Sequence, residues 1–405
     1  MSDFFSNNMD IRSKRFSIAD IFLCSCFLLS LYIYIILYFQ GNQLSISTTT
    51  ESGAIGTYKS YTALVATIVS LLFYIKHPSS PSSTTRIFGI FAFYALLITV
   101  FNGNNSTYKM YINQFTSMTL WIFVYLFFFA LFSAKSIKNK TISKFTTFNT
   151  ILFFLLFFTN YIIGKGLGFT YQYIESYFCI AMLPFIFTFC KKWKNLLLFI
   201  VIAATILAAK RTGMLACGIA IVFYYFLKDK KNTKKATNII KLTLLLLIAL
   251  ILANQFIGEE FSLIIERFQN ISEDDGSGRG TVFQEVFNLI INSSSNDLFF
   301  GHGYNTVIKT YIGYSAHNDF LEVTYDYGII GLAIYILFYL SLLLKRKHIK
   351  NINWRSAFTC SIIIFLINSI FSHMILFPNS ILVLCSFWGI IDGTIHSQKS
   401  YLQTT

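Results

Sequence analysis

Apolar runs of helix length, separated by short polar breaks, form the basic pattern of this chain. A transmembrane helix needs about 20 mostly apolar residues, and twelve such runs can be drawn, several of which are short and extend into their polar flanks. The runs cover residues 18–39, 60–75, 87–101, 115–134, 145–163, 176–190, 195–209, 212–227, 242–257, 320–344, 356–376 and 380–394. The pattern predicts an all-α, polytopic integral membrane protein with about 12 transmembrane helices.

One long hydrophilic segment, residues 258–316, interrupts this pattern late in the chain. It separates residues 1–257, with nine predicted transmembrane helices, from residues 317–405, with the last three helices and a polar tail. Within the segment, apolar positions recur at helical spacing from Thr281 to Ile291, which predicts an amphipathic helix near the membrane surface. Because a polar loop of this length in a compact protein is usually functional or disordered, we expect function on its side of the membrane.

The composition agrees with a membrane protein and excludes an ordinary soluble domain. Of the 405 residues, 55% are hydrophobic and only 12% are charged, whereas charged residues make up about a quarter of a soluble domain. The first apolar run, which follows Arg12, Lys14 and Arg15, is long enough to stay in the membrane as an anchor. The seven cysteines lie in or beside apolar runs without CxxC or Cys/His spacing, so they are predicted to be small core residues.

The net charge of +14 first suggests a nucleic-acid partner. The positions of the cations predict something else, because lysine and arginine are retained on the cytoplasmic side of a membrane during insertion. With the N-terminus inside, 24 of the 32 Lys and Arg residues fall in inner segments and 8 in outer ones. The basic surplus therefore indicates topology, with both termini cytoplasmic and anionic inner-leaflet lipid as the neighbour, and no nucleic acid.

Two outward-facing turns carry cations that suit phosphate. The turn Lys210-Arg211-Thr212-Gly213 joins two barely spanning runs. Snorkelling to the interface would explain a lone lysine there, but a guanidinium fits bidentate contact with phosphate, which favours a functional Arg211. Arg279 lies in the turn 273–280, where flanking glycines allow a ligand to approach the backbone. The acids of that turn are the alternative, a divalent-metal site, but no second ligand cluster accompanies them.

The segment from His317 to Gly331 holds the other candidate groups, just before and within a predicted transmembrane helix. Asp319, Glu322 and Asp326 recur at spacings of three and four, so they share one helical face. Three acids at the membrane boundary are costly against lipid, and we expect them to face a wet, polar cavity, simple solvation being the alternative. His317, at the head of the helix, can serve either as a general base or as a capping residue. His302, in the tight turn Gly301-His302-Gly303, is predicted to be structural.

In these motifs the chain resembles the O-antigen polymerase and O-antigen ligase superfamily of bacterial envelope biosynthesis. Besides the hydropathy profile and the single large late loop, the resemblance is carried by Lys210-Arg211, the Gly-Arg279 turn, Gly301-His302-Gly303, and above all His317-Asn318, Leu321-Glu322, Asp326, Gly328 and Gly331. The last stretch is the specific one, because hydropathy alone fits many families. The resemblance implies a GT-C-like helical fold in the inner membrane, a periplasmic loop at residues 258–316, and a glycosyltransferase acting on undecaprenyl-diphosphate-linked glycans.

The resemblance also implies a division of roles among these residues. Arg211 and Arg279 would bind the diphosphate, with Lys210 beside them, and His317 would take the proton from the acceptor hydroxyl. Asn318, Glu322 and Asp326 would orient His317 or bind sugar hydroxyls. No metal and no cofactor is implied, because guanidinium groups can stabilise the leaving diphosphate.

Three functions remain open at the level of sequence. A Wzy-type polymerase extends the glycan on its lipid carrier, and a chain-length regulator protein is then a candidate partner. An O-antigen ligase moves the finished polymer to lipid A core and cleaves the same sugar-diphosphate bond, so only the acceptor separates the two. A polysaccharide flippase is typically marked by charges within mid-chain helices and an internal repeat, neither of which the sequence favours.

Overall fold

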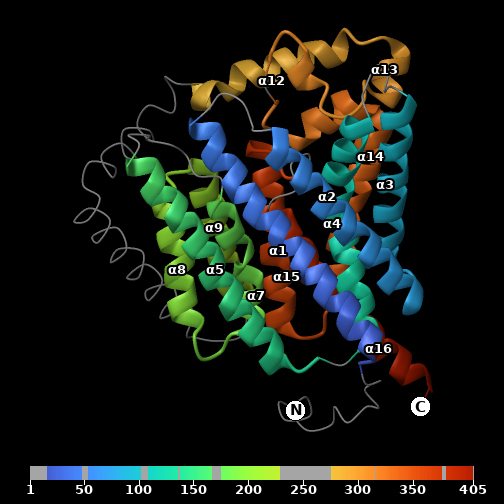
Figure 1. Ribbon diagram of the computed structural model, residues 1–405, viewed down its shortest axis with the longest axis vertical. Coiled ribbons are helices and arrows are strands. Elements are labelled where there is room, and N and C mark those ends of the chain that lie inside the picture. The colour runs from blue at the N-terminus through green and yellow to red at the C-terminus, as the bar shows by residue number, and fades with distance from the viewer. Residues whose placement is uncertain are drawn as a thin grey trace.

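The computed structural model describes residues 16–47, 53–101, 108–135, 137–166, 175–228, 275–313, 315–375 and 380–404. Every regular element in these ranges is helical (Figure 1). The elements are α1 (Ile18–Ser47), α2 (Gly53–Lys76), α3 (Ser83–Phe101), α4 (Tyr108–Ala134), α5 (Asn139–Gly166), α6 (Ser176–Ala181), α7 (Leu183–Phe189), α8 (Lys194–Leu207), α9 (Arg211–Lys228), α12 (Asp275–Ile291), α13 (Ser295–Phe300), the 3₁₀ turn η2 (Val307–Lys309), α14 (Asp319–His348), α15 (Ile352–Phe371) and α16 (Ile381–Thr404).

The apolar runs of the sequence correspond to these helices. Each predicted span within the described ranges falls on one helix or, for 176–190, on two, while the predicted span 242–257 lies outside the described residues. The 176–190 run breaks at Met182, because Pro184 at the start of α7 has no N–H to continue the α6 hydrogen bonds. The amphipathic helix predicted at 281–291 forms the main part of α12.

Six of the described helices are long and apolar enough to cross a membrane, by length and composition. They cover Ile18–Gln40, Gly56–Lys76, Asn139–Gly166, Arg211–Lys228, Asp319–His348 and Ile352–Phe371. The described part of the chain is therefore all-helical, and its long apolar helices are those of a multi-pass membrane protein, as the sequence predicted. The total of about 12 spans and the GT-C-like fold remain predictions.

Close helix packing at the centre of the bundle depends on small residues of α16. A Cβ added at Gly389 would lie 2.6 Å from the Tyr125 carbonyl oxygen of α4, and one at Gly393 would lie 2.6 Å from that of Phe129. The spacing Gly-x-x-x-Gly puts both on one helical face, which lets the two backbones approach each other. Aromatic side chains fill the surrounding core, where Phe27 of α1 stacks on Phe127 of α4 at 3.7 Å between ring centroids.

One end of the bundle is closed by buried ion pairs. Asp20 of α1 is 1% exposed and contacts Lys76 Nζ at 2.8 Å and Lys135 Nζ at 2.8 Å, through different carboxylate oxygens. Asp392 of α16 binds Lys345 Nζ of α14 at 2.6 Å. The cations at the ends of α2, α4 and α14 thus gather at the same end as the start of α1, in agreement with the predicted alternation of basic loops.

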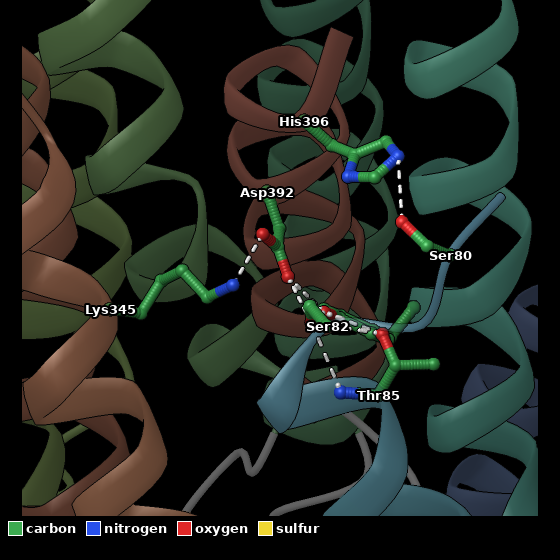
Figure 2. A network of polar contacts seen from close by, with 7 residues as sticks. Ser80, Ser82, Thr85, Lys345, Asp392 and His396 are labelled. Carbon is green, nitrogen blue, oxygen red and sulfur yellow. Dashed lines mark hydrogen bonds and ion pairs between the residues drawn. The ribbon is translucent and has the colours of Figure 1, made fainter. Parts of the chain in front are cut away.

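Figure 2 shows the second of these networks from close by. Besides Lys345, Asp392 accepts hydrogen bonds from Ser82 Oγ at 2.7 Å and from the Tyr125 hydroxyl at 2.5 Å. Ser82 directly precedes α3. The network therefore ties the start of α3 to the end of α14 and the middle of α16, and we call it the Asp392 network.

At the opposite end, α12 and α13 lie across the bundle and form a cap (Figure 1). The cap is fitted to α14 at a kink, where Gly328 has φ +68° and ψ −176°. A Cβ at Gly328 would lie 2.2 Å from the Phe299 carbonyl oxygen, and one at Gly301 would lie 2.3 Å from the Asp326 carbonyl oxygen. Two glycines thus allow the end of α13 to sit directly against the backbone of α14.

This close fit predicts a specific instability. Gly328→Ala should lower the free energy of unfolding by about 3 kcal/mol, because a Cβ is strained at positive φ and also overlaps Phe299. Gly218→Ala in α9 is the matched control, since nothing lies within 4 Å of its added Cβ. Thermal unfolding of the detergent-purified variants measures both, and equal melting temperatures for the two would contradict the close fit.

Candidate active site

The turn that carries Lys210 and Arg211 is held tightly against α6. The chain reverses through Ala209, which has a left-handed φ of +50°, and Arg211 is the first residue of α9. A Cβ added at Gly213 would lie 3.2 Å from both Tyr177 Cε1 and Ile180 Cδ1 of α6. Glycine at this position therefore lets the start of α9 approach α6 closely.

Arg279, which belongs to helix α12 of the cap, contacts the same turn. Arg279 Nη1 donates a hydrogen bond of 3.1 Å to Thr212 Oγ1, so α12 meets the start of α9 through the residue next to Arg211. The Tyr177 hydroxyl is hydrogen-bonded to both Thr212 and Ser372. Segments far apart in the sequence, from α6, α9, α12 and the end of α15, thus converge at one point.

His317 stands at the start of α14 in an unusual backbone conformation. Its φ is +51°, in the left-handed region that few residues other than glycine adopt. The next residue, Asn318, caps α14 by accepting a 3.1 Å hydrogen bond from Leu321 N, and its Nδ2 donates a 3.0 Å bond to the Ile370 carbonyl. Asn318 therefore uses both ends of its amide to fix the start of α14 to the end of α15.

A second histidine, which the sequence analysis did not identify, faces His317. The His317 and His373 rings are stacked with centroids 5.2 Å apart and an interplanar angle of 21°. Ser315 Oγ lies 3.3 Å from His373 Nδ1. The sequence analysis placed residue 373 inside the predicted 356–376 helix, whereas α15 ends at Phe371. An ionisable residue near the end of a long apolar run is the only sequence signal that pointed to it.

Positive charge surrounds this pair of imidazoles. Burial, followed by the charges of Arg279 and Lys210, lowers the pKa of His317 to about 4. Burial also lowers the pKa of His373 to about 3, with His317, Lys210 and Arg279 adding to the effect. Both rings are therefore neutral at pH 7, and a neutral imidazole can accept a proton.

The three carboxylates of α14 do not line a wet cavity, which corrects the sequence-based expectation. Asp319, Glu322 and Asp326 are 0%, 1% and 0% exposed, respectively. A buried carboxylate needs hydrogen-bond donors in place of water, and backbone N–H groups of the neighbouring loops are prominent among the donors here. The three acids therefore form hydrogen bonds within the protein and do not face solvent.

Two of the carboxylates, those of Glu322 and Asp319, each hold a loop segment next to one of the histidines. Glu322 Oε1 accepts a 2.6 Å hydrogen bond from Ala316 N, next to His317. Asp319 Oδ1 accepts a 2.9 Å bond from Met374 N, next to His373, while its Oδ2 accepts a 3.0 Å bond from the Tyr335 hydroxyl. These contacts favour orientation of the histidines over sugar binding for Glu322, and they add Asp319 to the residues that position the site.

Asp326 holds the turn that follows α13. Its Oδ2 accepts a 2.6 Å hydrogen bond from Asn305 N, and its Oδ1 accepts bonds from Thr306 N at 3.0 Å and Thr306 Oγ1 at 2.7 Å. His302, in the same turn, contacts Ser293 Oγ through Nε2 at 3.0 Å. Its ring stacks on Tyr325 at 4.2 Å between centroids. His302 is thus structural, as predicted, and Asp326 also acts on the protein backbone.

The acids that suggested a metal site give no support for one in the structure. Glu273 and Asp274 lie outside the described residues. Among the residues that the structure does describe, no group of three His, Cys, Asp or Glu side chains could hold a metal ion.

Part of this chain matches a known protein family. No curated protein matches this chain. Residues 196–336 match the family model Wzy_C, described as O-antigen ligase. The matched range runs from α8 into α14 and contains every residue that the sequence analysis nominated for the site, from Lys210 to Asp326, while His373 lies beyond it. Proteins of this family are membrane glycosyltransferase-like enzymes that act on lipid-linked glycans. Residues 196–336 of this chain are therefore similar to the O-antigen ligase family Wzy_C, in agreement with the resemblance to the O-antigen polymerase and ligase superfamily that the sequence motifs predicted.

Proposed function

We propose that this protein is an O-antigen polymerase, which joins undecaprenyl-diphosphate-linked oligosaccharide repeat units at the periplasmic face of the bacterial inner membrane. The observation that carries the proposal is the stacked pair of neutral imidazoles, His317 and His373, beside Arg279 and Lys210 in an O-antigen ligase domain. A base and a cluster of cations are the two components that transfer of a sugar from a diphosphate requires.

The proposed topology follows the distribution of charge. About 12 helices in a GT-C-like arrangement span the membrane, with residues 1–257 and 317–405 on either side of a periplasmic loop at 258–316. Both termini are cytoplasmic in this proposal, and the ion pairs of Asp20 and Asp392 with lysines lie at that side. The cap of α12 and α13 is then periplasmic, which puts the site where lipid-linked repeat units are expected.

In the proposed reaction, the acceptor hydroxyl oxygen attacks the anomeric carbon of the donor sugar. The bond from that carbon to the diphosphate oxygen breaks, and the departing carrier diphosphate keeps the electron pair. Arg211 and Arg279, with Lys210, stabilise its negative charge, because cations in a partly buried site act more strongly than in bulk water. No metal ion is part of this proposal.

His317 receives the proton of the acceptor hydroxyl. Its ring is neutral before the reaction, because its pKa of about 4 lies well below pH 7. The Asn318 cap and the hydrogen bond from Ala316 N to Glu322 hold the backbone on either side of it. His373 stacks against the ring and limits its movement, so we assign His373 to positioning.

An O-antigen ligase, which transfers polymer to lipid A core, is the second candidate, and the description of the matched family favours it. The donor is cleaved at the same bond in both reactions, so the cations and His317 would act identically. The acceptor alone differs, and it decides between the two.

Deleting the gene in its host and separating the surface glycan on a gel tests the proposed function. Loss of a polymerase should leave core that carries a single repeat unit. Unsubstituted core together with polymer accumulating on its lipid carrier would identify the ligase instead. Repeat units trapped on the inner side of the membrane would identify a flippase and contradict both glycosyltransferase assignments.

Replacing the proposed base should abolish sugar transfer without unfolding the protein. We expect His317→Asn to lower the rate by roughly 100-fold or more, because general-base catalysis contributes about 10²–10⁴, while asparagine tolerates the positive φ of this position. His348→Asn, on the exposed far end of the same helix, is the matched control. A rate for His317→Asn equal to the control, at equal protein level, would remove His317 from the reaction.

The charge of Lys210 should set the acid limb of the pH profile. Positive charge lowers the pKa of His317, so Lys210→Gln should raise that pKa and move the acid limb of activity to higher pH. Lys309→Gln, at an exposed position of the cap, should leave the limb in place. The measurement is the rate of glycan extension by purified protein from pH 4 upward, and a limb that stays put in Lys210→Gln would show that this lysine does not tune the base.

A further inference from the structure

The short helix α13 changes from polar to aromatic along its length. Ser295 and Asn296 are exposed at its start, and Ser294 caps it by accepting a 3.2 Å hydrogen bond from Asp297 N. Phe299 and Phe300 end it, with 51% and 49% of their surface exposed. A polar beginning and an apolar end are typical of a segment that enters a membrane from the water side.

The aromatic end of α13 is attached to the middle of α3. The Tyr94 hydroxyl donates hydrogen bonds to the Tyr327 carbonyl at 2.9 Å and to the Phe300 carbonyl at 3.4 Å. Tyr94 lies seven residues before the end of α3 at Phe101. At 1.5 Å per residue, α3 continues about 10 Å beyond the level of this contact. The end of α13 therefore does not sit above the bundle but beside it.

The depth of α13 can be measured from the Asp392 network at the opposite end of the bundle (Figure 2). Ser82 of that network and Tyr94 are 12 residues apart along α3, which corresponds to about 18 Å. Lys345 and Gly328 are 17 residues apart along α14, which corresponds to about 26 Å. Both values are smaller than the roughly 30 Å thickness of the hydrocarbon core. With the Asp392 network at the cytoplasmic boundary, as in the proposed topology, the end of α13 therefore lies within the depth of the core.

The neighbouring surface is also apolar and exposed. Phe93 and Val100 of α3 are 63% and 58% exposed, and Ile329 of α14 is 42% exposed. These side chains belong to helices whose outer faces meet lipid in a multi-pass protein. Ile329 follows Gly328, whose backbone meets Phe299, and Phe93 precedes Tyr94, which binds the Phe300 carbonyl, so exposed apolar residues of α3 and α14 flank the contact with α13.

We propose that Phe299 and Phe300 insert among the acyl chains of the membrane leaflet on the side of the cap. The occupant of this surface is lipid, which matches the depth of α13, its polarity gradient and the continuity with the exposed faces of α3 and α14. The insertion anchors the cap directly before the turn that Asp326 holds, so it fixes the height of α12 and Arg279 relative to the membrane. This inference does not depend on which sugar is transferred.

Site-directed fluorescence tests the insertion. A polarity-sensitive, thiol-reactive probe is attached to Phe299→Cys in full-length protein whose partly exposed Cys24 and Cys26 are replaced by alanine; the other five cysteines are buried. The protein is reconstituted into phosphatidylethanolamine and phosphatidylglycerol vesicles. We expect blue-shifted emission that lipids brominated in the acyl chains quench and that aqueous iodide does not.

Asn296→Cys, one turn earlier on the polar half of α13, is the matched control, and its probe should be quenched by iodide. Iodide quenching of the Phe299→Cys probe equal to that of the control would overturn the proposal, because the aromatic end would then be in water. Shielding from both quenchers, together with a cross-link between two copies through that position, would overturn it in favour of a protein neighbour.

Discussion

The need to satisfy buried carboxylates organises the functional end of this protein. Asp319, Glu322 and Asp326 are almost fully removed from solvent, and a carboxylate there is tolerable only when donors replace its lost water. Backbone N–H groups of three loops supply much of that replacement. One helical face of α14 thereby fixes the segments around His317, His373 and the turn after α13. By holding these loops in place, the acids also fix the positions of the two imidazoles.

The cations and imidazoles of the site affect each other through their charges. Burial, together with the charges of Arg279 and Lys210, lowers the pKa of both histidines, which keeps the rings neutral but makes them weak bases. In the proposed reaction the donor brings a diphosphate to these cations, and its negative charge would offset their effect on His317. The base would then gain strength when the donor is bound. A single cluster of charges would thus serve the leaving group and couple the base to the presence of substrate.

Acidic and basic residues have different contacts at the two ends of the bundle. At the basic end, lysines pair with the buried Asp20 and Asp392 and tie helix ends together. At the other end, Arg279 meets a threonine hydroxyl, and the carboxylates bind backbone instead of cations.

The sequence by itself determined the helical class, the positions of the helices and the division of basic residues between two faces, because the hydrophobic period and the positive-inside bias act locally along the chain. Motifs also predicted Arg279 and His317 as candidate site residues. Only the tertiary structure decided that Asp319, Glu322 and Asp326 turn inward, that His373 stacks on His317, and that α13 lies beside α3. These features depend on contacts between segments far apart in the chain, and a pattern of neighbouring residues carries no information about which distant backbone will supply a hydrogen bond.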